Sequence, residues 1–328
     1  MTEPTEANSQ APLPLVLQEA IGKYVEWLRG HLLSEQEQNT IDTPLYHYTD
    51  GQGLTGILKD QKLRFTDYRH MNDPSELIYG IQTARDALKL VATGADGRVE
   101  AFLNAIAEML SDENLSMVLE FFTVSFSRER DDLGQWRAYA DNGRGYAIGF
   151  APRLFQVVDE PNPQQHEAFF VGPVVYGATP CIARHRLAIE RAAEIFLDAL
   201  EMNADLMRDR AIGIPFIVAF RREVIAGPLI WNCLTSKHPA YAHEREVRLI
   251  KMGQRDRLMP YIKTRLRGSE IVPYLEHATP MRHPQDVFEI VAGPATPTDA
   301  ERTVRTLLNS LGVDPSVQIS RSDIPYRP

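Results

Sequence analysis

The sequence predicts an α+β fold built on a mixed, mostly antiparallel sheet. Its predicted strands are short and are spread along the whole chain of 328 residues. Helices of very different lengths interrupt these strands, without the regular strand–helix alternation of a doubly wound fold. In addition, no glycine-rich phosphate loop of either common type follows a predicted strand. A parallel nucleotide-binding sheet is therefore a poor match, and an α+β sheet is favoured.

The N-terminal region predicts a leader followed by one helix. Residues 1–14 are polar, contain proline and lack a basic start followed by an apolar core, so we expect a disordered leader and no ordinary secretory signal. Apolar residues then recur at helical spacing over 15–33, which predicts an amphipathic helix within an N-terminal helical segment, 15–40.

The remaining residues, 41–328, are interpreted as a single α+β domain. Apolar and β-branched runs next to turn residues predict its strands, and periodic runs predict its helices. Strands are expected at 45–49, 62–65, 121–127, 146–150, 174–176, 246–250, 287–291 and 317–320, and helices at 54–58, 75–90, 99–110 and 298–311. The helical block of 182–234 is predicted to be an insertion or cap on the sheet. Within the turn 72–76, Ser75 and Glu76 have the residue types of a helix start, which indicates a structural role.

Composition limits the partners of this protein. The net charge of −9 argues against broad, nonspecific nucleic-acid binding. Residues 245–267 are nevertheless locally basic, and this region is either a phosphate-facing surface or a solvated charged loop. The basic residues of that region are Arg245, Arg248, Lys251, Arg255, Arg257, Lys263, Arg265 and Arg267.

The sequence predicts a cytoplasmic protein without a membrane partner. It contains no run of about 18 apolar residues, the length needed for a transmembrane helix. Its two cysteines, Cys181 and Cys233, are far apart in apolar or mixed surroundings. We expect neither a disulfide framework nor a reactive nucleophile from them, which fits a reducing compartment.

The most informative segment is the run from Lys237 to Ile250. Its end is apolar, as a strand should be, yet Glu244, Glu246 and Arg248 alternate along it. Alternate residues of a strand share one face, and buried charges need partners or a ligand. This face is therefore either a solvated edge, satisfied by Lys237, Arg64 or Arg137, or the wall of a site.

Two further segments carry polar side chains at strand ends. His47 and Tyr48 precede a glycine turn, where the imidazole could hold a ribose hydroxyl and the tyrosine could stack on a flat ring. Ser125 and Ser127 share one strand face and could orient a carboxylate. Ordinary backbone hydrogen bonding would also explain these residues.

The aromatic pair Trp136 and Tyr139 has two possible roles. Their spacing of three residues puts both on one helix face, where they could form the wall of a binding site. Taken alone, core packing explains them better.

The sequence gives no sign of a metal or a common hydrolase motif. HExxH, paired CxxC, G-x-S-x-G and Walker patterns are all absent. His238 and His243 flank Tyr241 but lack a third ligand, so we expect no metal site.

Several segments in order resemble the bacterial domain-of-unknown-function family 2971. The resemblance covers roughly residues 45–328. It rests on KLRFTDYRHMNDPSE, FTVSFSRERDDLGQWRAYADNGRGYAIGF, KHPAYAHEREVRLI, EIVAGP and SRSDIPYR. The family name itself implies no activity.

The order of the polar strands is also similar to that of ADP-ribosyltransferases, in which NAD lies in a cleft between two small antiparallel sheets. This resemblance implies NAD as substrate. His47 would hold the nicotinamide ribose or carboxamide, Ser125 or Ser127 would brace the glutamates, and Glu246 would bond the ribose 2′-hydroxyl. A carboxylate lowers the barrier because cleavage builds positive charge on the sugar, and Glu244 could deprotonate the acceptor.

The signature is mixed, because transferases with Ser-x-Ser and Glu-x-Glu usually begin with arginine. Those that begin with histidine usually place a stacking tyrosine in the second motif, and Tyr68, Tyr79 or Tyr139 could serve here. The resemblance implies a split-sheet enzyme that transfers ADP-ribose to a protein or nucleic-acid acceptor or hydrolyses NAD, in a bacterial toxin or phage-defence setting. The alternative is a non-enzymatic nucleotide-sensing or protein-interaction module.

Overall fold

The computed structural model describes residues 12–71, 75–111, 119–155 and 169–326. Most of the predicted leader, and residues 72–74 of the predicted turn, lie outside this set. The chain divides into two compact units. Of the described residues, a helical unit combines 12–34, 81–110 and 179–234, and a sheet unit combines those within 35–80, 111–178 and 235–326.

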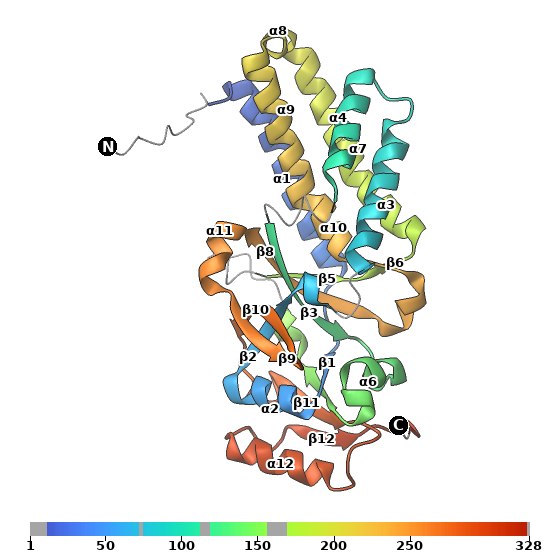
Figure 1. Ribbon diagram of the computed structural model, residues 1–328, viewed down its shortest axis with the longest axis vertical. Coiled ribbons are helices and arrows are strands. Elements are labelled where there is room, and N and C mark those ends of the chain that lie inside the picture. The colour runs from blue at the N-terminus through green and yellow to red at the C-terminus, as the bar shows by residue number, and fades with distance from the viewer. Residues whose placement is uncertain (1–11, 72–74, 112–118, 156–168, 327–328) are drawn as a thin grey trace, which may run out of the picture. The chain divides into compact units, whose positions relative to one another are not determined.

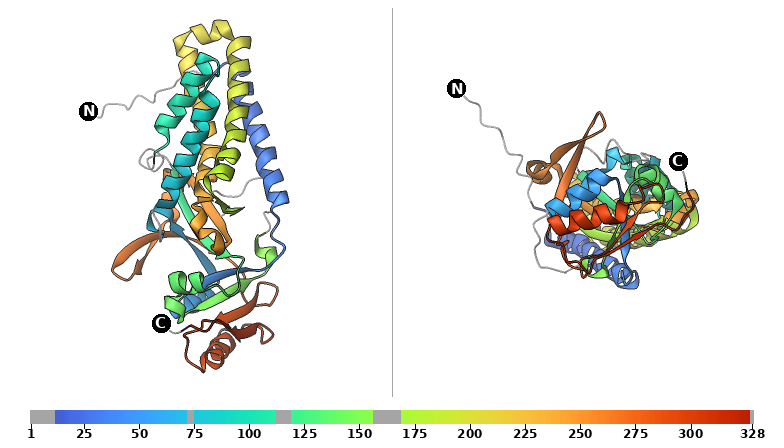
Figure 2. Two further views of the ribbon diagram at one scale, coloured as in Figure 1. Left: turned by 90° about the vertical axis from the view of Figure 1, so that its right-hand side faces the viewer. Right: turned by 90° about the horizontal axis from the view of Figure 1, so that it is seen from below.

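Long helices, packed alongside one another, form the helical unit (Figures 1 and 2). Stacked aromatic rings fill its interior: the rings of Phe102 and Phe196 lie 4.0 Å apart, and Phe220 stacks on both. Burying such rings is the main stabilising contribution available to a helix bundle. The helices that contribute to this unit are α1 (Leu15–Gln38), α3 (Ser75–Ala92), α4 (Gly97–Met109), α7 (Ala178–Met202), α8 (Ala204–Arg208), α9 (Arg210–Val224), the π-helical η4 (Ile225–Leu229) and α10 (Ile230–Leu234).

The sheet unit contains a mixed, mostly antiparallel sheet, as the sequence predicts. Eight strands follow the order β12-β11-β4-β1-β3-β2-β10-β9, and β8 joins this path by pairing with both β3 and β5. Among the described residues, β11–β12 is the one parallel pair of this sheet, and β6 and β7 form a separate parallel pair. The strands are β1 (Leu45–Thr49), β2 (Lys62–Asp67), β3 (Leu119–Ser127), β4 (Tyr146–Phe150), β5 (Phe170–Pro173), β6 (Val175–Tyr176), β7 (Ser236–Lys237), β8 (Glu246–Gln254), β9 (Lys263–Arg267), β10 (Glu270–Ala278), β11 (Val287–Ala292) and β12 (Gln318–Arg321).

Short helices connect these strands. The longer ones are amphipathic or capped, as in α2, where the side chain of Asp50 accepts a hydrogen bond from the Gly53 amide. The helices of this unit are α2 (Gly51–Asp60), η1 (Tyr68–His70), α6 (Leu133–Tyr139), η2 (Asp141–Gly143), η3 (Pro152–Phe155), η5 (Pro239–Glu244), α11 (Arg255–Leu258), η6 (Met259–Tyr261) and α12 (Ala300–Ser310).

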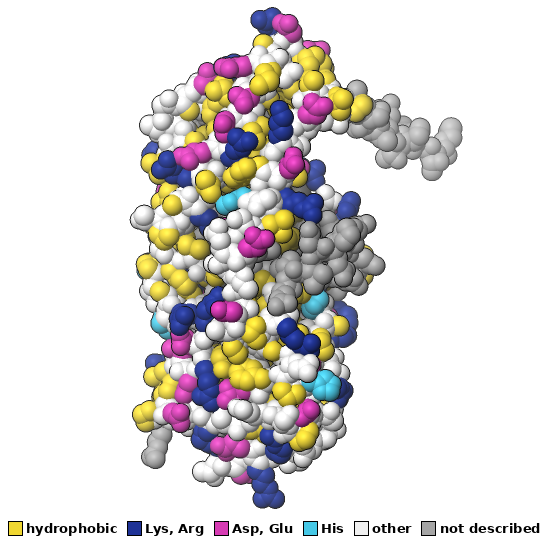
Figure 3. Space-filling model, turned by 180° about the vertical axis from the view of Figure 1, so that it is seen from behind, with side chains coloured by type: hydrophobic (Ala, Val, Ile, Leu, Met, Phe, Trp, Pro, Cys, Tyr) yellow, Lys and Arg dark blue, Asp and Glu magenta, His cyan; other side chains and the backbone are white. Residues whose placement is uncertain are grey.

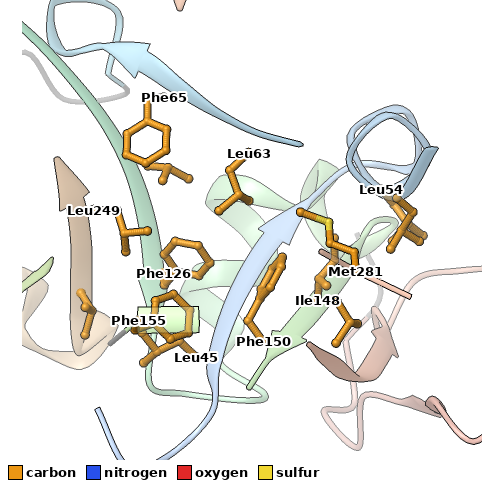
Figure 4. Close-up of a cluster of buried hydrophobic side chains, with 14 of the residues drawn as sticks. Leu45, Leu54, Leu63, Phe65, Phe126, Ile148, Phe150, Phe155, Leu249 and Met281 are labelled. Atoms are coloured by element: carbon orange, nitrogen blue, oxygen red, sulfur yellow. The ribbon is translucent and has the colours of Figure 1, made fainter. Parts of the chain in front are cut away.

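A hydrophobic core spans most of the sheet (Figure 4). Phe126 of β3 lies at its centre, with its ring 5.5 Å from that of Phe150 and 5.0 Å from that of Phe155. Leu45 and Leu249 pack in the same cluster. Because this core uses one face of β1, β3 and β8, residues at alternate positions of these strands point elsewhere.

The sheet opens at one edge of β3. β8 pairs with β3 from Leu119 to Ser127 along one side. On the other side β2 pairs only at Phe122 and Thr123, and β1 only at Ser127. The strands β1 and β2 therefore diverge, and the β3 edge between residues 123 and 127 carries no strand partner.

The basic region of residues 245–267 is not a single loop between strands. The sequence left two alternatives for it, a phosphate-facing surface or a solvated charged loop; the loop alternative is wrong for residues 263–267, which form β9 and pair with β10 in a hairpin beside β2. Surface charge is otherwise mixed: on the face drawn in Figure 3, acidic and basic side chains are interspersed. Among the described helices, none has the length and apolar character needed to cross a membrane.

Candidate functional site

A pocket occupies the opening between β1 and β2. Its cavity volume is about 200 Å³. His47 from β1, Ser125 from β3 and Glu246 from β8 all line it. The three strands that carry the predicted site residues therefore meet at one place within the sheet unit, although they are far apart in the sequence.

A buried lysine organises the acidic wall of this pocket. The ammonium of Lys237 lies 2.8 Å from Glu76 Oε1, 2.6 Å from Glu244 Oε2 and 2.9 Å from Glu246 Oε2. Since the Lys237 side chain is only 2% exposed, these carboxylates take the place of its hydration shell. Attraction to Glu246 and Glu76 outweighs the effect of burial and raises the pKa of Lys237.

An arginine closes the cluster from the other side. Arg248 Nε lies 2.7 Å from Glu246 Oε1 and its Nη2 lies 2.9 Å from Oε2, a bidentate pair. The same Nη2 contacts Glu76. We refer to Glu76, Lys237, Glu244, Glu246 and Arg248 as the charged ring.

The charged ring rules out the solvated-edge interpretation of this segment, because its side chains are nearly all buried. Lys237, Arg64 and Arg137 were the three cations considered from the sequence as partners for the glutamates. Of these, Lys237 is the one that contacts them. Arg64 pairs with Asp60 instead, and Arg137 is exposed.

The sequence predicts that Glu244, Glu246 and Arg248 share one face of a strand, but Glu244 lies outside that strand. Glu244 ends the helix η5, and β8 begins only at Glu246. Arg245 between them adopts left-handed backbone geometry, with φ of 43°, which breaks the strand alternation. Both carboxylates still reach Lys237, so the two glutamates share a site but not a strand face.

The two serines support the glutamates in different ways. The Ser125 hydroxyl hydrogen-bonds to the Glu246 carboxylate. Ser127, which is buried, donates its hydroxyl proton to the backbone carbonyl of Glu244 at 2.6 Å. Ser125 lines the pocket, whereas Ser127 fixes the chain behind it.

The two carboxylates have opposite pKa shifts. Burial raises the pKa of Glu244, and the charges of Glu246 and Glu76 add to this effect against the attraction of Lys237. Burial acts in the same direction on Glu246, but Arg248 and Lys237 outweigh it and lower its pKa to about 2. Glu246 is thus a fixed anion, while Glu244 is the carboxylate that takes up a proton more readily.

The charged ring carries unbalanced charge. With all groups ionised, three carboxylates face two cations. Glu244 and Glu246 both line the pocket, so this excess negative charge is next to any ligand held there. Protonation of Glu244 or a positively charged ligand group would neutralise it.

His47 bridges the gap in the sheet. Its Nδ1 lies 2.9 Å from the carbonyl oxygen of Ser125, on the β3 edge that lacks a strand partner. A carbonyl can only accept, so Nδ1 carries the proton and Nε2 of the neutral ring is an acceptor. Burial lowers the pKa of His47 against the effect of this hydrogen bond, and nearby Arg265 lowers it further.

The predicted aromatic wall is divided between pocket and core. Tyr139 lines the pocket, and so does Tyr48, whose hydroxyl donates to the Glu129 carbonyl at 2.8 Å. Trp136 is fully buried instead, with its ring edge-on to Tyr48 at 4.8 Å. Of the three tyrosines considered as stacking partners, Tyr68 and Tyr79 do not line the pocket.

Part of the predicted basic region also lines the pocket. Arg265 and Arg267 on β9 line the pocket together with Arg64 on β2. Three other basic residues of that region form ion pairs away from the pocket: Arg245 pairs with Glu129, Arg255 with Glu120 and Lys263 with Glu276. The pocket therefore has one acidic and one basic wall.

Sequence reasoning gave Glu76 a structural role and missed its place in the site. Its position in the first turn of α3 fits helix capping. Its contact with Lys237 could not be predicted, because the two residues are 161 positions apart in the sequence. The sequence held one indication that Glu76 could belong to the site: it ends KLRFTDYRHMNDPSE, one of the segments that resemble the DUF2971 family. Among the described residues, no group of three or more histidine, cysteine, aspartate or glutamate side chains has the arrangement of a metal site.

Comparison with known proteins gives one match. Neither the curated proteins nor the solved structures contain a match to this chain. Residues 135–249 match the family model described as "Protein of unknown function (DUF2971)". The matched segment holds four members of the charged ring: Lys237, Glu244, Glu246 and Arg248. This match supports the resemblance to the DUF2971 family that the sequence motifs predict, over residues 135–249.

Proposed function

We propose that the pocket binds NAD and breaks its nicotinamide–ribose bond, with ADP-ribose passed to an acceptor or to water. The observation that carries this proposal is the meeting of His47, Ser125 and Glu246 in one pocket. These are the residue types, in the chain order, that the similarity to ADP-ribosyltransferases assigns to NAD binding and cleavage.

Glu246 supplies the fixed negative charge. Breaking the bond between ribose and nicotinamide builds positive charge on the sugar, and a preorganised carboxylate stabilises that charge. Arg248, Lys237 and Ser125 hold Glu246 ionised and in one orientation. In this proposal its carboxylate faces the ribose and accepts from the 2′-hydroxyl.

Glu244 acts as the acid–base group. Two neighbouring carboxylates whose surroundings push their pKa values apart typify paired acid–base and electrostatic roles. Glu244 has the raised pKa and lines the pocket, so it is suited to remove a proton from the attacking hydroxyl or water.

His47 and Tyr139 position the substrate. The Nε2 atom of neutral His47 accepts from a ribose hydroxyl or from the carboxamide N–H of nicotinamide. Tyr139 offers a ring for the flat nicotinamide. The divergence of β1 from β2 also fits the split sheet of the transferases, although here β3 keeps the strands in one continuous sheet.

One observation favours a binding module that does not cleave NAD. Both oxygens of Glu246 already contact cations, which reduces the negative charge available to a sugar. Under this second proposal the pocket senses a nucleotide, and the charged ring only stabilises the sheet unit.

Nicotinamide release from labelled NAD tests the enzymatic proposal. The wild-type protein should release nicotinamide, and Glu246→Gln should reduce the rate by about 100-fold or more, the scale of losing one preorganised charge. Glu301→Gln, on a surface pair with Arg321, is the control and should keep the wild-type rate. Equal release by wild type and Glu246→Gln, or none from wild type across protein and nucleic-acid acceptors, would favour the binding module.

A further inference from the structure

The basic wall of the pocket contains one arginine without a carboxylate partner. Among the described residues, Arg64 pairs with Asp60 and Arg267 with Glu270. Arg265 has no such pair, and its polar contact is with the Thr66 hydroxyl at 3.2 Å. Its Nε atom is buried and has no hydrogen-bond acceptor.

Neighbouring groups increase the need for an anion at Arg265. Arg265 and Arg267 alternate along β9 and share a face. The strand order β2-β10-β9 brings Arg64 of β2 to the same wall. Burial lowers the pKa of Arg265, and the positive charges of Arg64 and Arg267 add to this. A partly buried guanidinium in a positive field is unfavourable unless an anion balances it.

We propose that Arg265, with Arg64 and Arg267 beside it, forms an anion subsite that binds a phosphate group of the ligand. Guanidinium groups suit this role because their N–H groups match phosphate oxygens in pairs. The subsite deepens the proposed function and rests on it, because it assigns the diphosphate of a dinucleotide to the basic wall, apart from the charged ring.

The two walls then divide the ligand by charge. The acidic wall, with Glu244 and Glu246, faces the neutral or cationic ribosyl end. The basic wall, with Arg265, faces the anionic end. A nucleoside without phosphate can contact the acidic wall but cannot neutralise the basic wall. It should therefore bind more weakly than its phosphorylated counterpart.

Calorimetric titration with ADP-ribose and with adenosine tests the subsite. ADP-ribose should bind at least about tenfold more tightly than adenosine, and Arg265→Gln should remove at least about tenfold of the ADP-ribose affinity, as expected for one lost charge-assisted contact. Arg265→Lys, which keeps the charge, should lose less. Arg144→Gln, in an exposed pair with Asp141, is the matched control and should bind ADP-ribose like wild type.

Three results would overturn the subsite: equal affinity for ADP-ribose and adenosine, no binding of ADP-ribose, or unchanged ADP-ribose affinity in Arg265→Gln. Inorganic pyrophosphate should compete with ADP-ribose for wild type and not for Arg265→Gln, which tests whether the phosphates are what is bound. Because these measurements concern binding, the subsite can hold even if no nicotinamide is released, and the two failures are distinguishable.

Discussion

Lys237 is the residue on which the charged ring depends. It contacts three carboxylates in a buried position. Without it, Arg248 would still pair with Glu76 and Glu246, and Glu244 would lose its cation within the ring. A buried charge that loses its partner costs far more than a surface pair, because water cannot replace the missing contact.

Lys237→Met should lower the free energy of unfolding by about 3–5 kcal/mol, the range for breaking a buried ion pair. Urea unfolding of wild type and variant measures this difference. The control is Lys263→Met, whose exposed ammonium pairs with Glu276 and whose loss should change little. Similar effects of the two substitutions would contradict the central position of Lys237.

Glu246 should make stability depend on pH in a defined window. Its pKa in the folded protein is about 2, below the ordinary value of 4.5, so the unfolded chain binds the proton more strongly. Its contribution to stability is therefore complete above about pH 4.5 and is lost as the pH falls toward 2. Acid titration of the unfolding free energy should show a smaller loss in Glu246→Gln than in wild type, and the loss that remains comes from other carboxylates with lowered pKa values, such as Glu289 and Glu276.

Glu244 should make stability depend on pH in the opposite direction, so it serves as the comparison for Glu246. Its pKa is raised in the folded protein, so its contribution is present at low pH and disappears as the pH rises through that raised pKa. Glu244→Gln should remove this second dependence. A change of the pH profile in the same direction by both variants would contradict the opposite pKa shifts of Glu244 and Glu246.

At the scale of elements, His47 holds the opening of the sheet. Its ring donates to the Ser125 carbonyl, which has no strand partner because β1 and β2 have separated. The same side chain thus stabilises the gap and lines the pocket that the gap creates.

His47→Phe should destabilise the protein by about 1–3 kcal/mol, because it leaves a carbonyl of the sheet edge without a donor. His47→Gln can still donate from its amide and should recover much of that stability. Thermal or urea unfolding compares the two. Both variants should nevertheless bind nucleotide more weakly than wild type if the imidazole contacts the ligand; equal stability of the Phe and Gln variants would show that the hydrogen bond is unimportant.

The sequence predicts most elements of this fold because their patterns are local. The strand at 146–150 agrees residue for residue with β4, and the helix predicted from residue 15 is α1. The hairpin of β9 and β10 was missed because β9 is exposed and highly charged, with the sequence Lys-Thr-Arg-Leu-Arg. Pairing with neighbouring strands, which no local pattern reveals, makes this segment a strand.

The sequence predicts the residues of the candidate site less completely than it predicts the fold. His47, Ser125 and Glu246 were suggested by residue type, and all three line the pocket. The place of Glu76 in the site was not predicted, because its contact with Lys237 joins residues far apart in the chain. Arg265 belonged to the basic region for which the sequence left a phosphate-facing surface and a charged loop as alternatives. The left-handed backbone conformation of Arg245 could not be predicted either, because a residue other than glycine adopts it only uncommonly.

At the scale of the whole molecule, all residues that line the pocket belong to the sheet unit. Binding of ADP-ribose should therefore slow amide hydrogen exchange in β1, β3, η5 and β9. It should also stabilise the protein by about 2.7 kcal/mol at a ligand concentration 100 times the dissociation constant. Exchange that slows only in the aromatic core of α4, α7 and α9 would contradict this placement of the ligand.

In the proposed complex the pocket between β1 and β2 holds ADP-ribose, with its ribose at the charged ring and its phosphates at the basic wall. A crystal structure of the wild-type protein with ADP-ribose would show this placement. We expect the ribose within hydrogen-bonding distance of Glu246 or Glu244 and a phosphate within hydrogen-bonding distance of Arg265. ADP-ribose bound elsewhere, or a pocket left empty at a saturating ligand concentration, would contradict it.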